Sequence, residues 1–276
     1  MTRLAFLLGF ALLLAAGCSG SAGHELSWPQ PEQIGGARVA PASPAPDPAA
    51  PVAGALFAAQ PVCTPGEEKA LGNPRLAYAA VARGRTPALS RPGGAVVRVF
   101  EPVTVNGVPT VFAVLGAVVD VRCEVRWYRV HLPVRPNGAV GYVKADAIDL
   151  HHVRTRIEVD LSERRLDFFR DGRRLLRVTA AIGSATTPTP TGRFYVNQRL
   201  LALNPAGPYG PGGLGISAFS PVLVDWPQGG PIAIHGTNDP GSIGKAVSNG
   251  CLRVPNETLL WLFRATPAGT PVVIHP

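Results

Sequence analysis

PIAIHGTNDPGSIGKAVSNGCLRVPN, residues 231–256, is the stretch on which the interpretation of the whole chain depends. It opens with a short apolar run that is typical of a strand, and this run places His235 at or near a strand end. The glycines and prolines that follow predict a long turn. The chain returns through Ser248-Asn249-Gly250-Cys251, where a glycine permits a positive φ or a close backbone approach. The stretch therefore predicts a strand, a long turn and a tight turn that carries a cysteine.

The histidine and the cysteine each have a functional and a plain interpretation. A cysteine at a tight turn can place its sulfur beside an oxyanion hole of backbone N–H groups, and His235 would then act as its base. A lone cysteine in an apolar context is more often a small buried hydrophobe. No HxxxH or CxxC partner lies nearby, so a metal site is not expected. On residue types and spacing alone, the plain interpretation is the more frequent one.

A family resemblance changes that balance. His235-Gly236-Thr237, followed by Ser248-Asn249-Gly250-Cys251-Leu252-Arg253, resembles the active-site signature of the YkuD-type L,D-transpeptidases. That signature is His-Gly, a spacer of this order, and then Ser-(His/Asn)-Gly-Cys-(aliphatic)-Arg. Asn249 stands where many members have histidine. The resemblance extends upstream to about Arg154, through IEVDLSERRLDFF and TPTPTGRFYV, and covers nearly half of the chain.

The resemblance implies acyl transfer through a thiol. Cys251 would attack the carbonyl of the third residue of a peptidoglycan stem tetrapeptide and expel the terminal D-alanine, with His235 as the base. The backbone N–H groups of Gly250 and Cys251 would hold the oxyanion of the thioester-forming step. A side-chain amine of a neighbouring stem would resolve the thioester and give a 3→3 cross-link. Carbapenems, which mimic the acyl donor, are expected to acylate Cys251, and no cofactor is implied.

The other motif residues are assigned supporting roles. Ser248, Asn249 and Gly236 are expected to shape the turn or to orient the imidazole, since no aspartate is well placed to do so. Arg253 is expected to support the turn first and to meet a substrate carboxylate second, because bidentate recognition of carboxylates is the strength of arginine.

Other functions stay open at this point. An L,D-carboxypeptidase would give the same acyl group to water, and a sortase-like acyltransferase shares the Cys-His pair but carries its arginine on a separate strand. A non-catalytic cell-wall-binding protein is the third alternative, and the intact signature argues against it.

The N-terminus resembles a targeting segment, and residues 1–18 are interpreted as a signal peptide. Arg3 precedes an apolar run that ends at Gly17-Cys18 and is too short to cross a bilayer comfortably. Leu14-Ala15-Ala16-Gly17-Cys18 resembles a bacterial lipobox, which implies that Cys18 becomes lipid-modified and anchors the protein to the outer face of the cytoplasmic membrane, at the cell wall. Plain secretion after cleavage at a small residue is the alternative.

Residues 19–70 are rich in Ala, Pro and Gly and are interpreted as an extended linker, or as a disordered leader without a geometric role. With Cys18 and Cys251 assigned, Cys63 and Cys123 remain. Two such cysteines in an exported protein suggest a disulfide, and two free thiols are the less expected alternative.

Residues 71–150 predict a small all-β module. Asn106-Gly107 between β-branched runs is a strong hairpin signal, and Arg135-Pro136-Asn137-Gly138 predicts another turn. Several short strands joined by tight turns suggest a small barrel. The run WYRVHLPVRPNGAVGYV resembles bacterial SH3-like modules that accompany wall enzymes.

Residues 151–276 predict the catalytic domain, a β-sandwich with one short helix over residues 257–264, capped by Asn256. Asp171-Gly172 predicts a hairpin, and the Gly/Pro-rich stretch 204–217 predicts a long loop, either a substrate lid or surface. Tyr209, Phe219 and Trp226 are candidate walls of a substrate groove. The fold class is therefore mostly β: an SH3-like barrel followed by the catalytic sandwich.

The composition supports this class and limits the partners. The chain of 276 residues contains 31 Gly and 29 Pro but one Met, which favours turns and short strands over long helices. Its sequence pI is about 9.9, and the exposed arginines are most simply a solvated face. Their summed charge favours anionic wall polymers or lipid headgroups. No stacking platform with interleaved basic residues is present, so a nucleic-acid partner is not expected.

Overall fold

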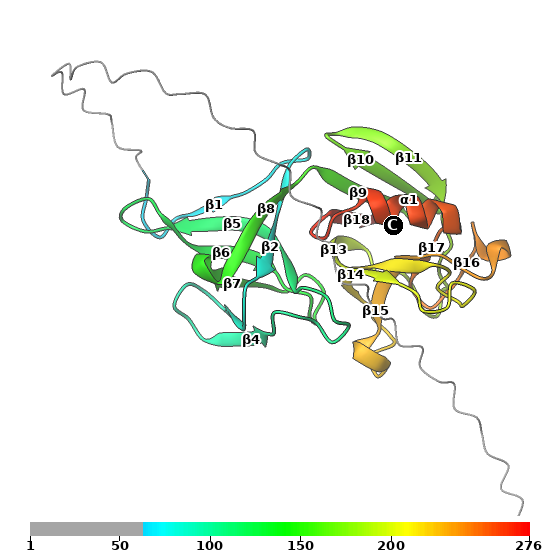
Figure 1. The fold of residues 1–276 in the computed structure, drawn as a ribbon, viewed down its shortest axis with the longest axis horizontal. Helices are drawn as coiled ribbons and strands as arrows, with labels where there is room; N and C mark the ends of the chain where they lie inside the picture. Colours follow the sequence, from blue (N-terminus) through cyan, green and yellow to red (C-terminus); the bar gives the residue numbers. More distant parts are fainter. Residues whose placement is uncertain (1–62) are drawn as a thin grey trace, which may run out of the picture.

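The computed structural model describes residues 63–276, so the expected signal segment, Cys18 and residues 19–62 of the expected linker lie outside the described residues. Figure 1 shows two β-rich units, one cyan to green and the other green to red. The first is an eight-stranded sheet with the order β4-β3-β7-β6-β5-β2-β8, and β1 pairs with β5. Its strands are β1 (Glu68–Ala70), β2 (Ala77–Ala82), β3 (Thr86–Leu89), β4 (Val96–Phe100), β5 (Val111–Val119), β6 (Val125–His131), β7 (Val140–Lys144) and β8 (Ile148–Val153).

The first sheet forms from short strands whose apolar residues alternate, with a core made of the inward-facing side chains. Phe112, Val130 and Val143 are fully buried there. Cys63 and Cys123 form a disulfide that joins residues 60 positions apart, and it ties the start of the described chain to the β5–β6 turn. β1 falls inside the expected linker, and β8 continues to Val153, so the folded part begins earlier and the first sheet ends later than the boundaries drawn from composition.

The second unit is an eight-stranded sheet with the order β11-β10-β9-β18-β13-β14-β15-β17, accompanied by the pair β12-β16. The helix α1 packs on β14 and β15, and through Trp261 on Phe168 of β10. The mostly β class with one α-helix is confirmed for the described residues. The elements are β9 (Thr155–Asp160), β10 (Arg165–Arg170), β11 (Arg173–Thr179), β12 (Ile182–Gly183), β13 (Gly192–Leu201), β14 (Gly212–Phe219), β15 (Pro231–His235), β16 (Ala246–Ser248), β17 (Leu252–Arg253), α1 (Asn256–Ala265) and β18 (Pro271–His275), with short 3-10 turns η1 (Ala145–Ala147), η2 (Pro227–Gly229) and η3 (Pro240–Ser242).

The last strand of the chain lies inside the sheet. β18, the final apolar run of the sequence, pairs in parallel with β9 on one side and antiparallel with β13 on the other. β18 therefore completes the middle of the second sheet, and the hairpin β10–β11, turned at Asp171 and Gly172 with positive φ at both, forms its edge.

The Gly/Pro-rich stretch 204–217 is only partly a loop, which corrects the prediction. Its second half begins β14, whose residues from 212 to 218 are all buried between β13 and β15. Glycine is needed there because the neighbouring strands approach closely: a Cβ on Gly213 would stand 3.1 Å from the Cβ of His235. Glycines inside a strand mark such close approaches, and here they hide the alternating pattern by which strands are recognised.

The two units meet at the β14–β15 connection. Arg135 donates from Nη2 to the carbonyl oxygens of Ser220 and Gly229, each at 2.7 Å. Asn137 accepts a hydrogen bond from the backbone N–H of Phe219 and donates one to its carbonyl, both at 2.9 Å. The turn between β6 and β7 is therefore fixed to the segment that leads into the strand of His235.

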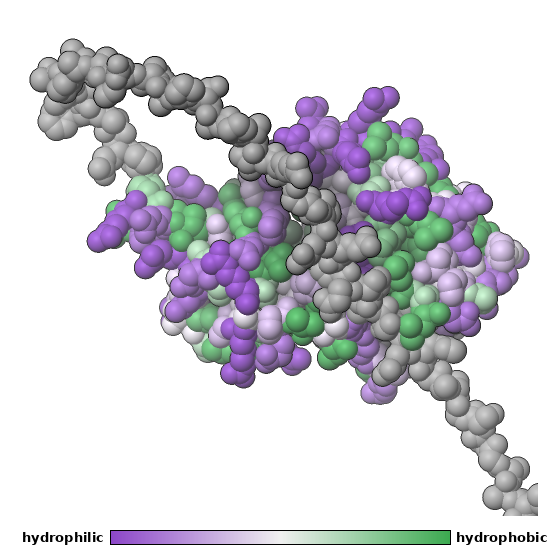
Figure 2. Space-filling view, in the orientation of Figure 1, coloured by the Kyte–Doolittle hydropathy of each residue, from purple (hydrophilic) through white to green (hydrophobic). Residues whose placement is uncertain are grey.

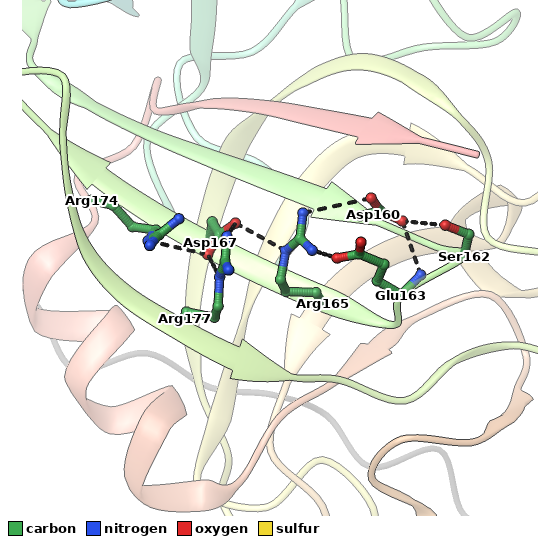
Figure 3. Close-up of polar contacts among 7 residues, drawn as sticks. All are labelled: Asp160, Ser162, Glu163, Arg165, Asp167, Arg174 and Arg177. Atoms are coloured by element: carbon green, nitrogen blue, oxygen red, sulfur yellow. Dashed lines mark hydrogen bonds and ion pairs between the residues drawn. The ribbon is translucent and has the colours of Figure 1, made fainter.

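The outer face of β9, β10 and β11 carries a network of charged side chains (Figure 3). Asp167 is 5% exposed and accepts hydrogen bonds from Arg177 at 2.8 and 3.0 Å and from Arg165 at 3.1 Å. The hydrogen bonds from Arg177 hold the pKa of the Asp167 carboxyl below its usual range. Arg165 also pairs with Asp160 and Glu163. Figure 2 shows the hydrophilic rim that results over β10 and β11. In residues 63–276 no helix is long and apolar enough to cross a bilayer.

Candidate active site

The sheet register brings the histidine and the cysteine of the motif to one face. β15 and β17 pair in parallel, with Ile234 opposite Leu252 and His235 opposite Arg253. Because side chains alternate along a strand, Cys251 and Arg253 project on the same side as His235. The Sγ atom of Cys251 accepts a hydrogen bond from the backbone N–H of Ala233 at 3.4 Å, which fixes the cysteine beside this strand.

His235 is held as a neutral imidazole. Its Nδ1 lies 2.5 Å from the carbonyl oxygen of Gly236, so the Nδ1–H donates to that oxygen and Nε2 keeps its lone pair. The side chain is 4% exposed, and burial lowers the pKa of His235 to about 4, although the hydrogen bond to Gly236 opposes this. The positive charge of Arg253 lowers the pKa of His235 further. The backbone carbonyl at Gly236 thus orients the ring.

The thiol of Cys251 is also held in its neutral form. Desolvation by burial raises the pKa of the Cys251 thiol, while the Ala233 N–H and the charge of Arg253 act in the opposite direction. A thiol with a raised pKa beside an imidazole with a lowered pKa favours the neutral pair over a thiolate–imidazolium pair. The arrangement is therefore suited to general-base activation of the thiol at the moment of attack.

The tight turn before Cys251 is braced by Ser248. The Ser248 hydroxyl donates to the carbonyl oxygen of Cys251 at 2.6 Å and accepts from the N–H of Gly250 at 3.1 Å. Gly250 has φ +107°, and a Cβ there would stand 2.9 Å from a methyl carbon of Ile232, so the position requires glycine. The N–H of Gly250 is engaged inside the turn, which corrects its expected role as an oxyanion donor. Asn249 is exposed.

A second segment, which the motif alone does not identify, holds this turn from outside. The Thr187 hydroxyl donates to the carbonyl oxygen of Ser248, and the Thr189 hydroxyl donates to that of Gly250, each at 2.9 Å. Thr189 also accepts a hydrogen bond from the N–H of Gly183 at 2.8 Å and is itself buried. The polar run TPTPTG was the available sequence signal, but nothing in it indicates which turn it would contact.

Asn256 serves the histidine loop instead of the helix. The expected cap is not formed, since α1 begins at Asn256 after Pro255 and has no side-chain capping bond. The Asn256 Oδ1 accepts a hydrogen bond from the N–H of Thr237 at 2.7 Å. A Cβ on Gly236 would stand 2.3 Å from the same oxygen, so the glycine of the His-Gly pair makes room for it.

The three candidate aromatic residues lie in different places. Tyr209 is beside the pair of His235 and Cys251: its ring centroid lies 5.0 Å from that of His235. Burial raises the pKa of Tyr209, and the negative charge that Cys251 carries once its thiol has ionised raises it further. Phe219 instead contacts the first unit, with the Arg135 guanidinium carbon 5.5 Å from its ring centroid. Trp226 is 48% exposed and immediately precedes η2 on the β14–β15 connection. Of the three candidates, the structure thus places only Tyr209 against the pair of His235 and Cys251.

Comparison with known proteins matches residues 154–274 to the model of the YkuD family, described as the L,D-transpeptidase catalytic domain. YkuD of Bacillus subtilis (strain 168), whose name places it among the L,D-transpeptidases, is 35% identical over 127 residues, which are 46% of this chain and 70% of that protein. YkuD of Bacillus licheniformis is 39% identical over 44% of this chain and 66% of its own length. Among solved structures, the catalytic domain of an E. faecium L,D-transpeptidase acylated by ertapenem is 26% identical, with a TM-score of 0.32 over 44% of this chain and 96% of that one.

Proposed function

Because the chain belongs to the YkuD family of L,D-transpeptidase catalytic domains, we propose that it is a peptidoglycan L,D-transpeptidase that forms 3→3 cross-links through a thioester on Cys251. The observation that carries the proposal is that a neutral imidazole at the end of β15 and the thiol of Cys251, which immediately precedes β17, lie on one face of the sheet. Because the Nδ1–H of His235 donates to the Gly236 carbonyl, only Nε2 can accept a proton. Nε2 is therefore the atom that would take the proton of the thiol.

Acylation begins with the stem tetrapeptide seated against the Cys251 thiol. As Sγ attacks the carbonyl carbon of the third stem residue, the thiol proton passes to Nε2 of His235. The tetrahedral intermediate then collapses: the C–N bond to the terminal D-alanine breaks, and the departing amine takes the proton from Nε2. The products of this half-reaction are a thioester on Cys251 and free D-alanine, with His235 neutral again.

The second half-reaction repeats the proton transfers with a different amine. A side-chain amine of a neighbouring stem attacks the thioester carbon and gives a proton to Nε2 of His235. The C–S bond breaks, and the proton returns to Sγ as the thiol leaves. The new amide is the cross-link. Tyr209 forms a wall of the substrate site in this proposal, since its ring lies against His235.

Two further features complete the proposal. The β-lactam ring of a carbapenem presents a strained acyl donor to the same thiol, so carbapenems should acylate Cys251. The first unit is proposed to be an SH3-like module that helps the enzyme engage the wall, and the protein is proposed to act outside the cytoplasmic membrane, held there through Cys18. The disulfide between Cys63 and Cys123 supports export, because disulfides persist in oxidising compartments.

The test uses the full chain and its Cys251→Ser variant with a disaccharide-tetrapeptide, and the products are separated and weighed. The proposal expects a cross-linked dimer and released D-alanine with the native chain and neither with the variant. Release of D-alanine with tripeptide and no dimer would replace the transpeptidase by a carboxypeptidase.

A further inference from the structure

Arg253 has no partner for its side chain in the part of the chain that the structure describes. Its backbone N–H and carbonyl bond to Ala181 in a β-bridge, at 3.0 and 2.8 Å, so the main chain is fixed. Its guanidinium, in contrast, forms no ion pair or hydrogen bond within residues 63–276, and the Nε atom is buried without an acceptor. The residue as a whole is only half-buried. The guanidinium therefore does not support the tight turn, which corrects the first of the two roles assigned to Arg253.

An unpaired charge in such a place is energetically unfavourable in the free protein. Burying a donor without an acceptor has a cost, and this cost is greater when the donor carries charge. Arg165 and Arg177 of the same unit show the contrast, since both share the carboxylate of Asp167. The guanidinium of Arg253 is thus a set of preformed donors that an incoming anion would satisfy.

The position of Arg253 indicates which part of a ligand it would meet. Arg253 pairs directly with His235 across the parallel strands, and it follows Cys251 by two positions on the same face. Its charge acts on both groups, lowering the pKa of His235 and opposing the rise in the pKa of Cys251. Side chains two positions apart leave a strand about 6.6 Å from each other. An anion bound by Arg253 would therefore lie on the same face as the carbonyl that Cys251 attacks, close to it.

From this placement we infer that Arg253 is a specificity-determining residue that binds the free α-carboxylate of the amino acid expelled from the acyl donor. The inference rests on the proposed function. In the stem tetrapeptide the terminal carboxylate is one residue beyond the scissile carbonyl, so it is the anion that lies nearest to the carbon that Cys251 attacks. A planar guanidinium can hold a carboxylate by two parallel hydrogen bonds.

The inference explains how the site selects a chain end. A donor whose last residue is extended or amidated lacks the anion, so it would leave the buried Nε of Arg253 unsatisfied in the complex. Discrimination of this type is strong, because a site built to pair with a charged group loses that pairing entirely with the analogue that lacks it. The enzyme would accordingly act on stems that end one residue after the attacked carbonyl.

The experiment compares two acyl donors, a disaccharide-tetrapeptide with a free terminal carboxylate and the same compound with a terminal carboxamide. kcat/KM for acylation of Cys251 is measured with the full native chain, Arg253→Gln, Arg253→Lys and the control Arg173→Gln, which removes an exposed arginine on β11. The native chain and the control should prefer the carboxylate by about tenfold or more, the value expected for a charge-assisted pair. Arg253→Gln should bring the ratio close to one by slowing only the carboxylate donor, and Arg253→Lys should give an intermediate ratio.

The outcomes separate the inference from the proposed function. If Cys251 is acylated by both donors at equal rates in the native chain, the function stands and the inference is wrong. If Arg253→Gln slows both donors by the same factor, the arginine has a structural role and the inference is again wrong. If neither donor acylates the native chain, the proposed function itself fails, and the inference fails with it. Retained acylation of Arg253→Gln by the carboxamide shows that this variant is folded.

Discussion

Replacing Thr189 by valine should uncouple the turn of Cys251 from the segment that holds it. The Thr189 hydroxyl connects the N–H of Gly183, at 2.8 Å, to the carbonyl oxygen of Gly250, at 2.9 Å. Valine has nearly the same shape but can neither accept from the first group nor donate to the second. Thr189 is 6% exposed, so water cannot readily replace the hydroxyl.

The magnitude follows from the two groups left without partners. An unsatisfied buried polar group costs about 1–3 kcal/mol, so the loss of both hydrogen bonds in Thr189→Val should lower the free energy of unfolding by about 2–6 kcal/mol. Because one of the two groups belongs to the residue that precedes Cys251, the thiol should also lose its fixed position. A displacement of the nucleophile of about 1 Å can slow a reaction by about 100-fold.

Two measurements check this prediction, with Thr189→Ser as the matched control that keeps the hydroxyl. The free energy of unfolding is obtained by denaturant titration, and the rate of acylation by a carbapenem is followed by intact-protein mass. Thr189→Ser should stay close to the native chain in acylation rate, while Thr189→Val should be slower by about 10- to 100-fold. Equal acylation rates for Thr189→Val and the native chain would show that the turn is positioned without this hydroxyl.

Three further predictions concern the protonation of His235, the glycine beside it on β14 and the contact between the two units. Burial lowers the pKa of His235 to about 4, whereas the pKa of an unfolded histidine is about 6.5. As the pH falls, the unfolded chain therefore binds the proton first. The free energy of unfolding should decrease by up to about 3 kcal/mol as the pH drops from about 6.5 to 4. Denaturant titrations at several pH values should find this slope reduced in His235→Gln; an unchanged slope would assign it to other groups. Gly213→Ala should lower the free energy of unfolding by about 1–3 kcal/mol and slow acylation, because its Cβ would stand 3.1 Å from that of His235. In the control Gly84→Ala, the new Cβ would have nothing within 4 Å, so neither the free energy of unfolding nor the acylation rate should change. Asn137→Ala removes both hydrogen bonds to the Phe219 backbone and should lower the free energy of unfolding by about 1–2 kcal/mol; no loss would mean that the two units are held together by other contacts.

The proposed nucleophile and base could be predicted from the sequence because the motif that resembles the family signature is local. A histidine at the end of an apolar run and a cysteine after a glycine are visible in the printed letters. The prediction that glycine is needed before Cys251 is confirmed by the positive φ of Gly250. The hairpin at Asp171 and Gly172 was predictable for the same reason, since both residues tolerate the φ values that such a turn requires.

Long-range contacts account for what could not be predicted. Asparagine is a residue type that often caps helices, but the Oδ1 of Asn256 accepts a hydrogen bond from the backbone N–H of Thr237 instead. The first part of β14 was predicted to be a loop because glycine lowers strand propensity. Glycine is needed at position 213 because the side chain of His235 lies close to it on the neighbouring strand. The role of Gly250 as an oxyanion donor failed for a similar reason, because the hydroxyl of Ser248 already occupies its N–H.

In the proposed reaction Cys251 carries the acyl group and His235 is its base. The most direct measurement is the intact mass of the full native chain after brief incubation with the disaccharide-tetrapeptide, followed by peptide mapping of the adduct. We expect an added mass equal to the donor without its terminal D-alanine, located on Cys251. This adduct should be absent from Cys251→Ser and should form much more slowly in His235→Gln. An adduct on another residue, or the same rate of formation in His235→Gln, would contradict it.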